Sequence, residues 1–161
     1  MIMHFIFKFI LVSIFLVGSF FIFSSFGGSA SGGDVLPKAI RIDNILKEIT
    51  IGQTKFQVEV ADTPALQAKG LSGHKALLEN QGMLFIFKEP SMPGFWMKDM
   101  NFPIDIIWIS DGKVVGIAEN LLPDNSPSRP LYYPPSIIDR VLEITAGTVL
   151  KYNLKIGDDV E

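Results

Sequence analysis

An apolar segment near residue 105 constrains the fold more than any other feature of the sequence. Residues Ile104–Ser110 are apolar up to the closing serine, with the exception of Asp105, and Asp111-Gly112 follows directly. This dipeptide suits the positive φ angles of a two-residue turn between antiparallel strands. The next segment, Lys113–Asn120, is therefore the predicted partner strand. Because the first strand is apolar at consecutive positions, we expect it to be buried on both sides.

The other elements are predicted from residue alternation and from turn-forming residues. Strands are predicted over Glu48–Gly52, Lys55–Ala61, Met83–Phe87 and Arg140–Ile144, an extended stretch over Phe95–Lys98, and a closing turn and edge strand over Ile156–Val160. Short helices are predicted over Ala65–Lys69 and Ala146–Tyr152, loops or turns over 70–82, 89–94 and 99–103, and a proline-rich surface loop over Pro123–Pro135. These elements predict a mainly β, β-rich α+β domain: a small barrel-like sheet, closed or half-closed, with the helices at its ends.

An uncharged apolar segment at residues 9–26 precedes this domain. As a helix it would be about 27 Å long, close to the hydrocarbon thickness of a bilayer. We interpret residues 1–26 as a retained transmembrane anchor, with a signal peptide cleaved near Ala30 as the alternative. The Gly- and Ser-rich residues 27–47 are a predicted tether and lead-in, and 48–161 the folded domain. We expect that domain to lie outside the cytoplasm, or to be secreted or periplasmic if the leader is cleaved.

The charge and the cysteine content exclude several classes of function. The formal net charge is −3, so nucleic acid is not an expected partner. The sequence contains no cysteine, which rules out a disulfide framework, a thiol nucleophile and a lipid-modified cysteine. No His or Cys pair has the spacing of a metal site, so we expect no metal and no cofactor.

Eight short phrases, read in order, carry a resemblance to a known family. They are Lys69-Gly70-Leu71, Gly82–Phe87, Phe95–Lys98, Pro103–Ile107, Glu119-Asn120, Tyr133-Pro134-Pro135, Val141-Leu142-Glu143 and Gly157-Asp158. Together they resemble the DUF192 family of small, often exported or membrane-anchored domains, over about residues 48–161. The resemblance implies a mainly β fold and an extracytoplasmic address, and it implies no reaction. Ser72 and Asp99-Met100 depart from the usual pattern at two of these phrases.

Three charged residues stand within apolar stretches and are candidates for a site: Lys98, Asp105 and Glu119. A buried carboxylate is costly unless it is paired, so Asp105 should have a Lys or Arg partner, with Lys98 the natural candidate, or a set of backbone amides. The three charges could form a structural ion pair, or they could face a common cleft. In the second case Trp96 and Tyr133 would add flat aromatic contacts to a ligand.

These residues lead to three alternative functions. The first is a membrane-tethered, non-catalytic binding or accessory domain, with a saccharide or peptide as ligand and Trp96, Lys98, Asp105, Glu119 and Tyr133 as its site. The second is a cell-envelope hydrolase that acts on a polysaccharide through Asp105 and Glu119. The third is a purely structural envelope protein. The sequence has no nucleophile elbow and no phosphate-binding glycine loop, so we favour the first.

Overall fold

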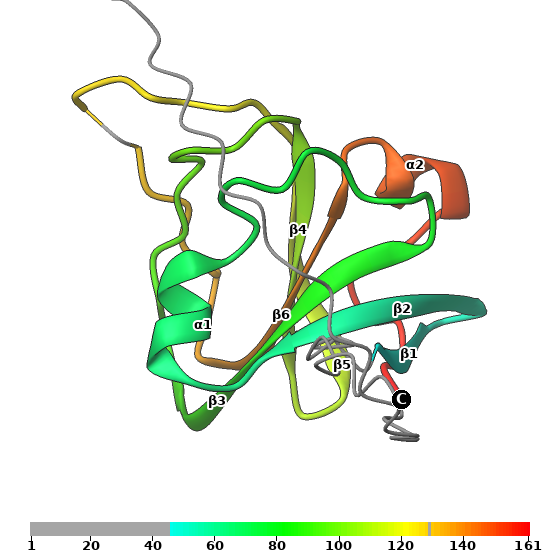
Figure 1. The fold of residues 1–161 in the computed structure, drawn as a ribbon. Coiled ribbons are helices and arrows are strands. Elements are labelled where there is room, and N and C mark those ends of the chain that lie inside the picture. The colour runs from blue at the N-terminus through cyan, green and yellow to red at the C-terminus, as the bar shows by residue number, and fades with distance from the viewer. Residues whose placement is uncertain (1–45, 129) are drawn as a thin grey trace, which may run out of the picture. The chain divides into compact units, whose positions relative to one another are not determined.

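Six strands form one mixed sheet in the order β1-β2-β3-β6-β4-β5 (Figure 1). The computed structural model describes residues 46–128 and 130–161, so the predicted anchor and nearly all of the predicted tether lie outside the described part. The strands are β1 (Lys47–Ile51), β2 (Thr54–Ala61), β3 (Gln81–Ser91), β4 (Ile104–Ser110), β5 (Lys113–Leu121) and β6 (Ile138–Thr145), and the helices are α1 (Pro64–Lys69) and α2 (Thr148–Tyr152). The prediction of a mainly β domain with two short helices is confirmed.

Two antiparallel hairpins are present, one of them the hairpin predicted at Asp111-Gly112. Strands β1 and β2 pair antiparallel, and so do β4 and β5. The second hairpin turns at Asp111 and Gly112, whose φ angles are 50° and 72°. These positive values are the reason that this dipeptide predicts the turn so well.

Helix α1 reverses the chain between β2 and β3, which therefore pair in parallel. The side chain of Thr63 caps the helix by accepting a hydrogen bond from the backbone N–H of Leu66, at 3.3 Å, and Pro64 occupies the first turn. Strand β3 is longer than predicted, because Glu89–Ser91 belong to it rather than to a turn. Strand β2 ends opposite Phe85, so the last residues of β3 have one open edge, where a proline without an N–H costs little.

The predicted barrel does not form, because the sheet is open and β1 and β5 are its edge strands. The predicted closing strand is replaced by two isolated bridges, in which Val160 pairs with Ile51 and Asp159 pairs with Lys113. The backbone groups of Thr50 and Glu161 exchange two hydrogen bonds, at 2.8 and 3.0 Å. The last residues of the sequence thus contact both sheet edges without forming a continuous strand between them.

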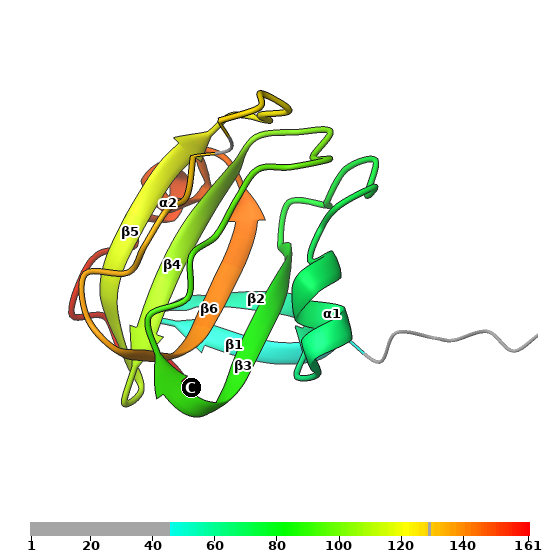
Figure 2. The ribbon, with the colours of Figure 1, turned by 90° about the vertical axis from the view of Figure 1, so that its left-hand side faces the viewer.

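The sheet has an apolar layer on each face. One layer includes Ile107, Ile144 and Val149, and α2 packs in it. The other includes Phe85, Ile106 and Leu71, and it is covered by the loop after α1 and by the segment between β3 and β4 (Figure 2). Strand β4, which lies between β6 and the edge strand β5, is buried on both sides, as its sequence predicts.

No helix in residues 46–128 or 130–161 is long and apolar enough to cross a bilayer.

Candidate functional site

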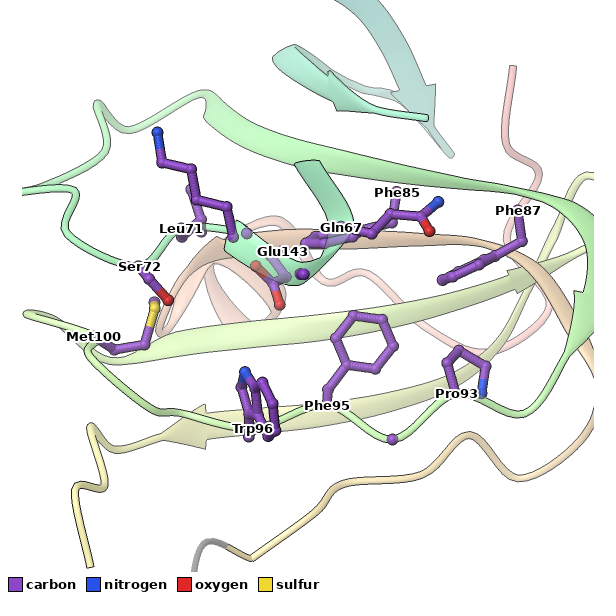
Figure 3. A pocket seen from close by; sticks show the side chains of 14 residues that line it. Gln67, Leu71, Ser72, Phe85, Phe87, Pro93, Phe95, Trp96, Met100 and Glu143 are labelled. Atoms are coloured by element: carbon purple, nitrogen blue, oxygen red, sulfur yellow. The ribbon is translucent and has the colours of Figure 1, made fainter. Parts of the chain in front are cut away.

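A pocket of about 310 Å³ opens beside α1, on the face of the sheet that carries Phe85 (Figure 3). Its walls come from four parts of the chain: α1 with the residues that follow it, β3, the segment between β3 and β4, and β6. The lining residues are Gln67, Ala68, Lys69, Gly70, Leu71, Ser72, Phe85, Phe87, Pro93, Gly94, Phe95, Trp96, Met100 and Glu143. Most of these side chains are apolar, and Glu143 is the one carboxyl group among them.

Hydrogen bonds to backbone carbonyls hold one wall of the pocket in place. The side-chain amide of Gln67 donates to the carbonyl of Ile86 at 2.8 Å and to that of Ala61 at 3.3 Å, which fastens α1 to β3 and to the end of β2. The hydroxyl of Ser72 donates to the carbonyl of Lys98 at 3.1 Å and joins the loop after α1 to the opposite wall.

The opposite wall is held by the proline-rich loop. Phe95 and Tyr132 exchange two backbone hydrogen bonds, at 2.9 and 2.8 Å. The ring of Phe95 meets that of Phe85 edge to face, with 5.4 Å between the centroids. Because backbone pairs and ring contacts fix both walls, the pocket exists before any ligand arrives.

Glu143 is the unusual group in this pocket. It is 5% exposed, and no hydrogen bond or ion pair reaches it from the part of the chain that the structure describes. Burial raises the pKa of its carboxyl to about 8, so the group is protonated at neutral pH. A buried carboxyl with a raised pKa in a pocket is a common mark of a functional site. In the sequence, Glu143 was not predicted as a site residue and stood out only as part of the family phrase Val141-Leu142-Glu143. Glu143 could have been identified by the sequence pattern that pointed to Asp105, which is a single carboxyl within an apolar strand.

Asp105 is buried completely but lies outside this pocket. One carboxylate oxygen accepts a hydrogen bond from the backbone N–H of Asn120 at 2.8 Å, and the other accepts from Val149 at 3.0 Å. Asn120 has a φ of 52° at an irregularity in the β4–β5 register, and Val149 is in the first turn of α2. Asp105 therefore holds both segments against β4. Of the two expected kinds of partner, the backbone amides are present and Lys98 is not.

The other predicted site residues do not gather around Asp105. The ammonium of Lys98 bonds to the carboxylate of its neighbour Asp99, at 2.7 Å, and is partly exposed. Glu119 is exposed, so the prediction that it is embedded in an apolar strand is wrong. Trp96 is 46% exposed and lines the pocket. Tyr133 is 56% exposed and lies next to the backbone of Gly94 at the pocket wall.

We expect Asp105→Asn to lower the free energy of unfolding by about 2–3 kcal/mol, because an amide offers one acceptor where two backbone N–H groups need one each. Urea unfolding monitored by circular dichroism measures this. Glu119→Gln is the matched control at an exposed position and should change stability by less than about 0.5 kcal/mol. Equal stabilities for the two variants would contradict the structural role of Asp105.

Glu143 makes stability depend on pH. The folded protein keeps this proton up to about pH 8, whereas the unfolded chain loses it near 4.5. The unfolded state therefore binds fewer protons in this window, and the free energy of unfolding falls as the pH rises through it. We expect the stability of Glu143→Gln relative to the wild type to increase between about pH 4.5 and 8 and then to level off. Urea unfolding across this range tests it, and a constant difference would show that the carboxyl is not held protonated.

Comparisons with known proteins identify a family and no activity. No curated protein matches the chain. A protein of unknown function from Novosphingobium aromaticivorans is similar, with 30% identity and a TM-score of 0.70 over 84% of this chain and 99% of that one. A proposed transcription regulator from Sinorhizobium meliloti is also similar, with 30% identity and a TM-score of 0.65 over 71% of this chain and 92% of that one. The family model of DUF192, described as "Uncharacterized ACR", matches residues 47–161. The chain therefore belongs to the DUF192 family.

Proposed function

We propose that this chain is a non-catalytic binding domain that takes a small, largely apolar ligand into the pocket beside α1. The observation that carries this proposal is Glu143, a buried carboxyl with no protein partner among the described residues, in a pocket otherwise lined mainly by apolar and aromatic groups. A concave apolar pocket with a few polar groups is the usual form of a small-molecule site.

A purely structural role explains Asp105 but not Glu143. Burial of an unpaired carboxyl destabilises a fold, and an apolar side chain of similar size would remove that cost. Because Glu143 destabilises the fold, we infer that it has a functional role and not a structural one. Binding a ligand that forms a hydrogen bond or an ion pair with this carboxyl in the pocket would be such a role.

The hydrolase alternative has less support. Glycoside hydrolysis commonly uses two carboxyl groups that flank one bond. Both oxygens of Asp105 are occupied by backbone N–H groups, and Glu119 does not line the pocket. Glu143 alone would have to act as the acid, without a second carboxyl among the lining residues. The net charge of −3 also gives no electrostatic reason to extend the regulator description of the Sinorhizobium protein to this chain.

A variant that fills the pocket tests the proposal. Ala65 and Ala68 are both exposed on α1, but only Ala68 lines the pocket. We expect Ala68→Phe to abolish the binding of fragments that bind the wild type, and Ala65→Phe to leave it unchanged. A fragment library screened by ligand-detected NMR measures this. Fragments that bind all three proteins equally, or no fragment hits at all, would contradict the proposal.

We also propose that the domain is tethered to a membrane through residues 9–26, as the uncharged apolar run favours, and that it faces away from the cytoplasm, as the family resemblance implies. A full-length chain that remains in the membrane pellet after an alkaline wash, with its complete mass, is the expected result. A soluble chain that begins near Ala30 would show instead that the leader is a cleaved signal peptide.

A further inference from the structure

We propose that the ligand of this pocket is an organic cation whose ammonium group pairs with Glu143 and whose body lies against Phe85, Phe95 and Trp96. This inference rests on the proposed binding function and names the chemical class of the ligand. Two independent features of the pocket support it: the unpartnered carboxyl, and the aromatic side chains around it.

The carboxyl group of Glu143 lacks hydrogen-bond donors and a positive charge, and an ammonium ion supplies both. Glu143 receives no hydrogen bond from the described residues, and it lies among the lining side chains with Ser72 and Met100 to one side and Phe85 and Phe95 to the other (Figure 3). An ammonium group brings up to three N–H donors together with the opposite charge. A neutral hydroxyl would supply one hydrogen bond and no charge, and an anion would be repelled once the carboxyl ionises.

The aromatic side chains that line the pocket also favour a positively charged ligand. The rings of Phe85 and Phe95 meet edge to face, and Trp96 lines the pocket beside them. The faces of such rings attract cations, more strongly when water is excluded. A cavity of about 310 Å³ is at the small end of ligand pockets, so it suits a compact amine better than an extended chain of sugars.

Other charged groups lie near the pocket without neutralising Glu143. Lys69 is the one cationic residue among the lining residues, and it is exposed at the end of α1, where solvent screens its charge. His74 lies on the loop after α1 and faces Glu59, at 3.6 Å between the ring nitrogen and a carboxylate oxygen. Neither His74 nor Glu59 lines the pocket.

Three probes of nearly equal size separate charge from shape: 2-phenylethylamine, which is a cation, 2-phenylethanol, which is neutral, and phenylacetate, which is an anion. Binding to the full-length chain in lipid nanodiscs is measured by ligand-detected NMR against empty nanodiscs. At about pH 8.5 the amine should bind at least about tenfold more tightly than the other two. Glu143→Gln should weaken amine binding about tenfold or more and should affect alcohol binding much less, because the alcohol makes no ion pair with the carboxyl, and Ala68→Phe should abolish binding of all probes.

The pH dependence gives a second readout. An ammonium ion that pairs with Glu143 must displace the proton from the carboxyl below about pH 8. The affinity for the amine should therefore rise about tenfold per pH unit up to about pH 8 and then level off, whereas the affinity for the alcohol should not rise. His74→Gln is the control for the other titratable group nearby, and it should keep the wild-type profile.

The outcomes separate this inference from the proposed function. If the alcohol or phenylacetate binds as tightly as the amine and Glu143→Gln changes neither, the assignment of a cation is wrong, while a loss of binding in Ala68→Phe still supports the pocket as the site. If the amine binds equally to the wild type and to Ala68→Phe, the cation does not occupy this pocket and the inference is overturned.

Discussion

The burial of strand β4 on both faces is the constraint on which the rest of this domain depends. A strand without a solvent face needs a packed layer above it and another below. Helix α2 and the residues that follow it contribute to one layer, and the loop after α1 with the segment between β3 and β4 contributes to the other. A polar group on β4 or on its neighbour β6 therefore lies in one of two separate layers. A buried one that meets no donor or acceptor there has no hydrogen bond, as the indole N–H of Trp108 and the hydroxyl of Thr145 have none among the described residues.

Two acidic residues illustrate this constraint in opposite ways. Ile106 of β4 pairs with Glu143 of β6, so Glu143 faces the same layer as Ile106, and Asp105, one residue earlier, faces the other layer. Asp105 meets two backbone N–H groups and holds the fold together. Glu143 lines a cavity, and burial raises the pKa of its carboxyl to about 8. The same functional group is thus hydrogen-bonded within the fold on one face and lines a cavity without a protein partner among the described residues on the other.

The pocket itself depends on how the chain connects the strands. Because β2 and β3 are parallel, the chain must cross over between them, and α1 provides this connection beside the sheet. The proline-rich loop then returns along the chain between β3 and β4 and pairs with it at Phe95. The cavity lies between α1 and the segment that connects β3 to β4. A strand order with hairpins throughout would place no helix beside Phe85, and this wall of the pocket would not exist.

Much of the local structure could be predicted from the sequence, because local signals determine it. Asp111-Gly112 has the positive φ angles that its turn requires, Thr63-Pro64 starts α1, and the apolar run in Ile104–Ser110 predicts burial on both sides. The family phrases also identified DUF192, and the match over residues 47–161 confirms it. The barrel was the main error: strand count alone does not say whether the two edge strands meet.

The sequence by itself therefore determined the elements, their turns and the family, since each depends on residues close together along the chain. Only the tertiary structure decided that Asp105 is satisfied by Asn120 and Val149, and that Glu143 is left beside a cavity. Those partners are brought together from distant parts of the chain. The face that each carboxyl occupies depends on the register between β4 and β6, and a shift of one residue would place both carboxyls on the same face of the sheet.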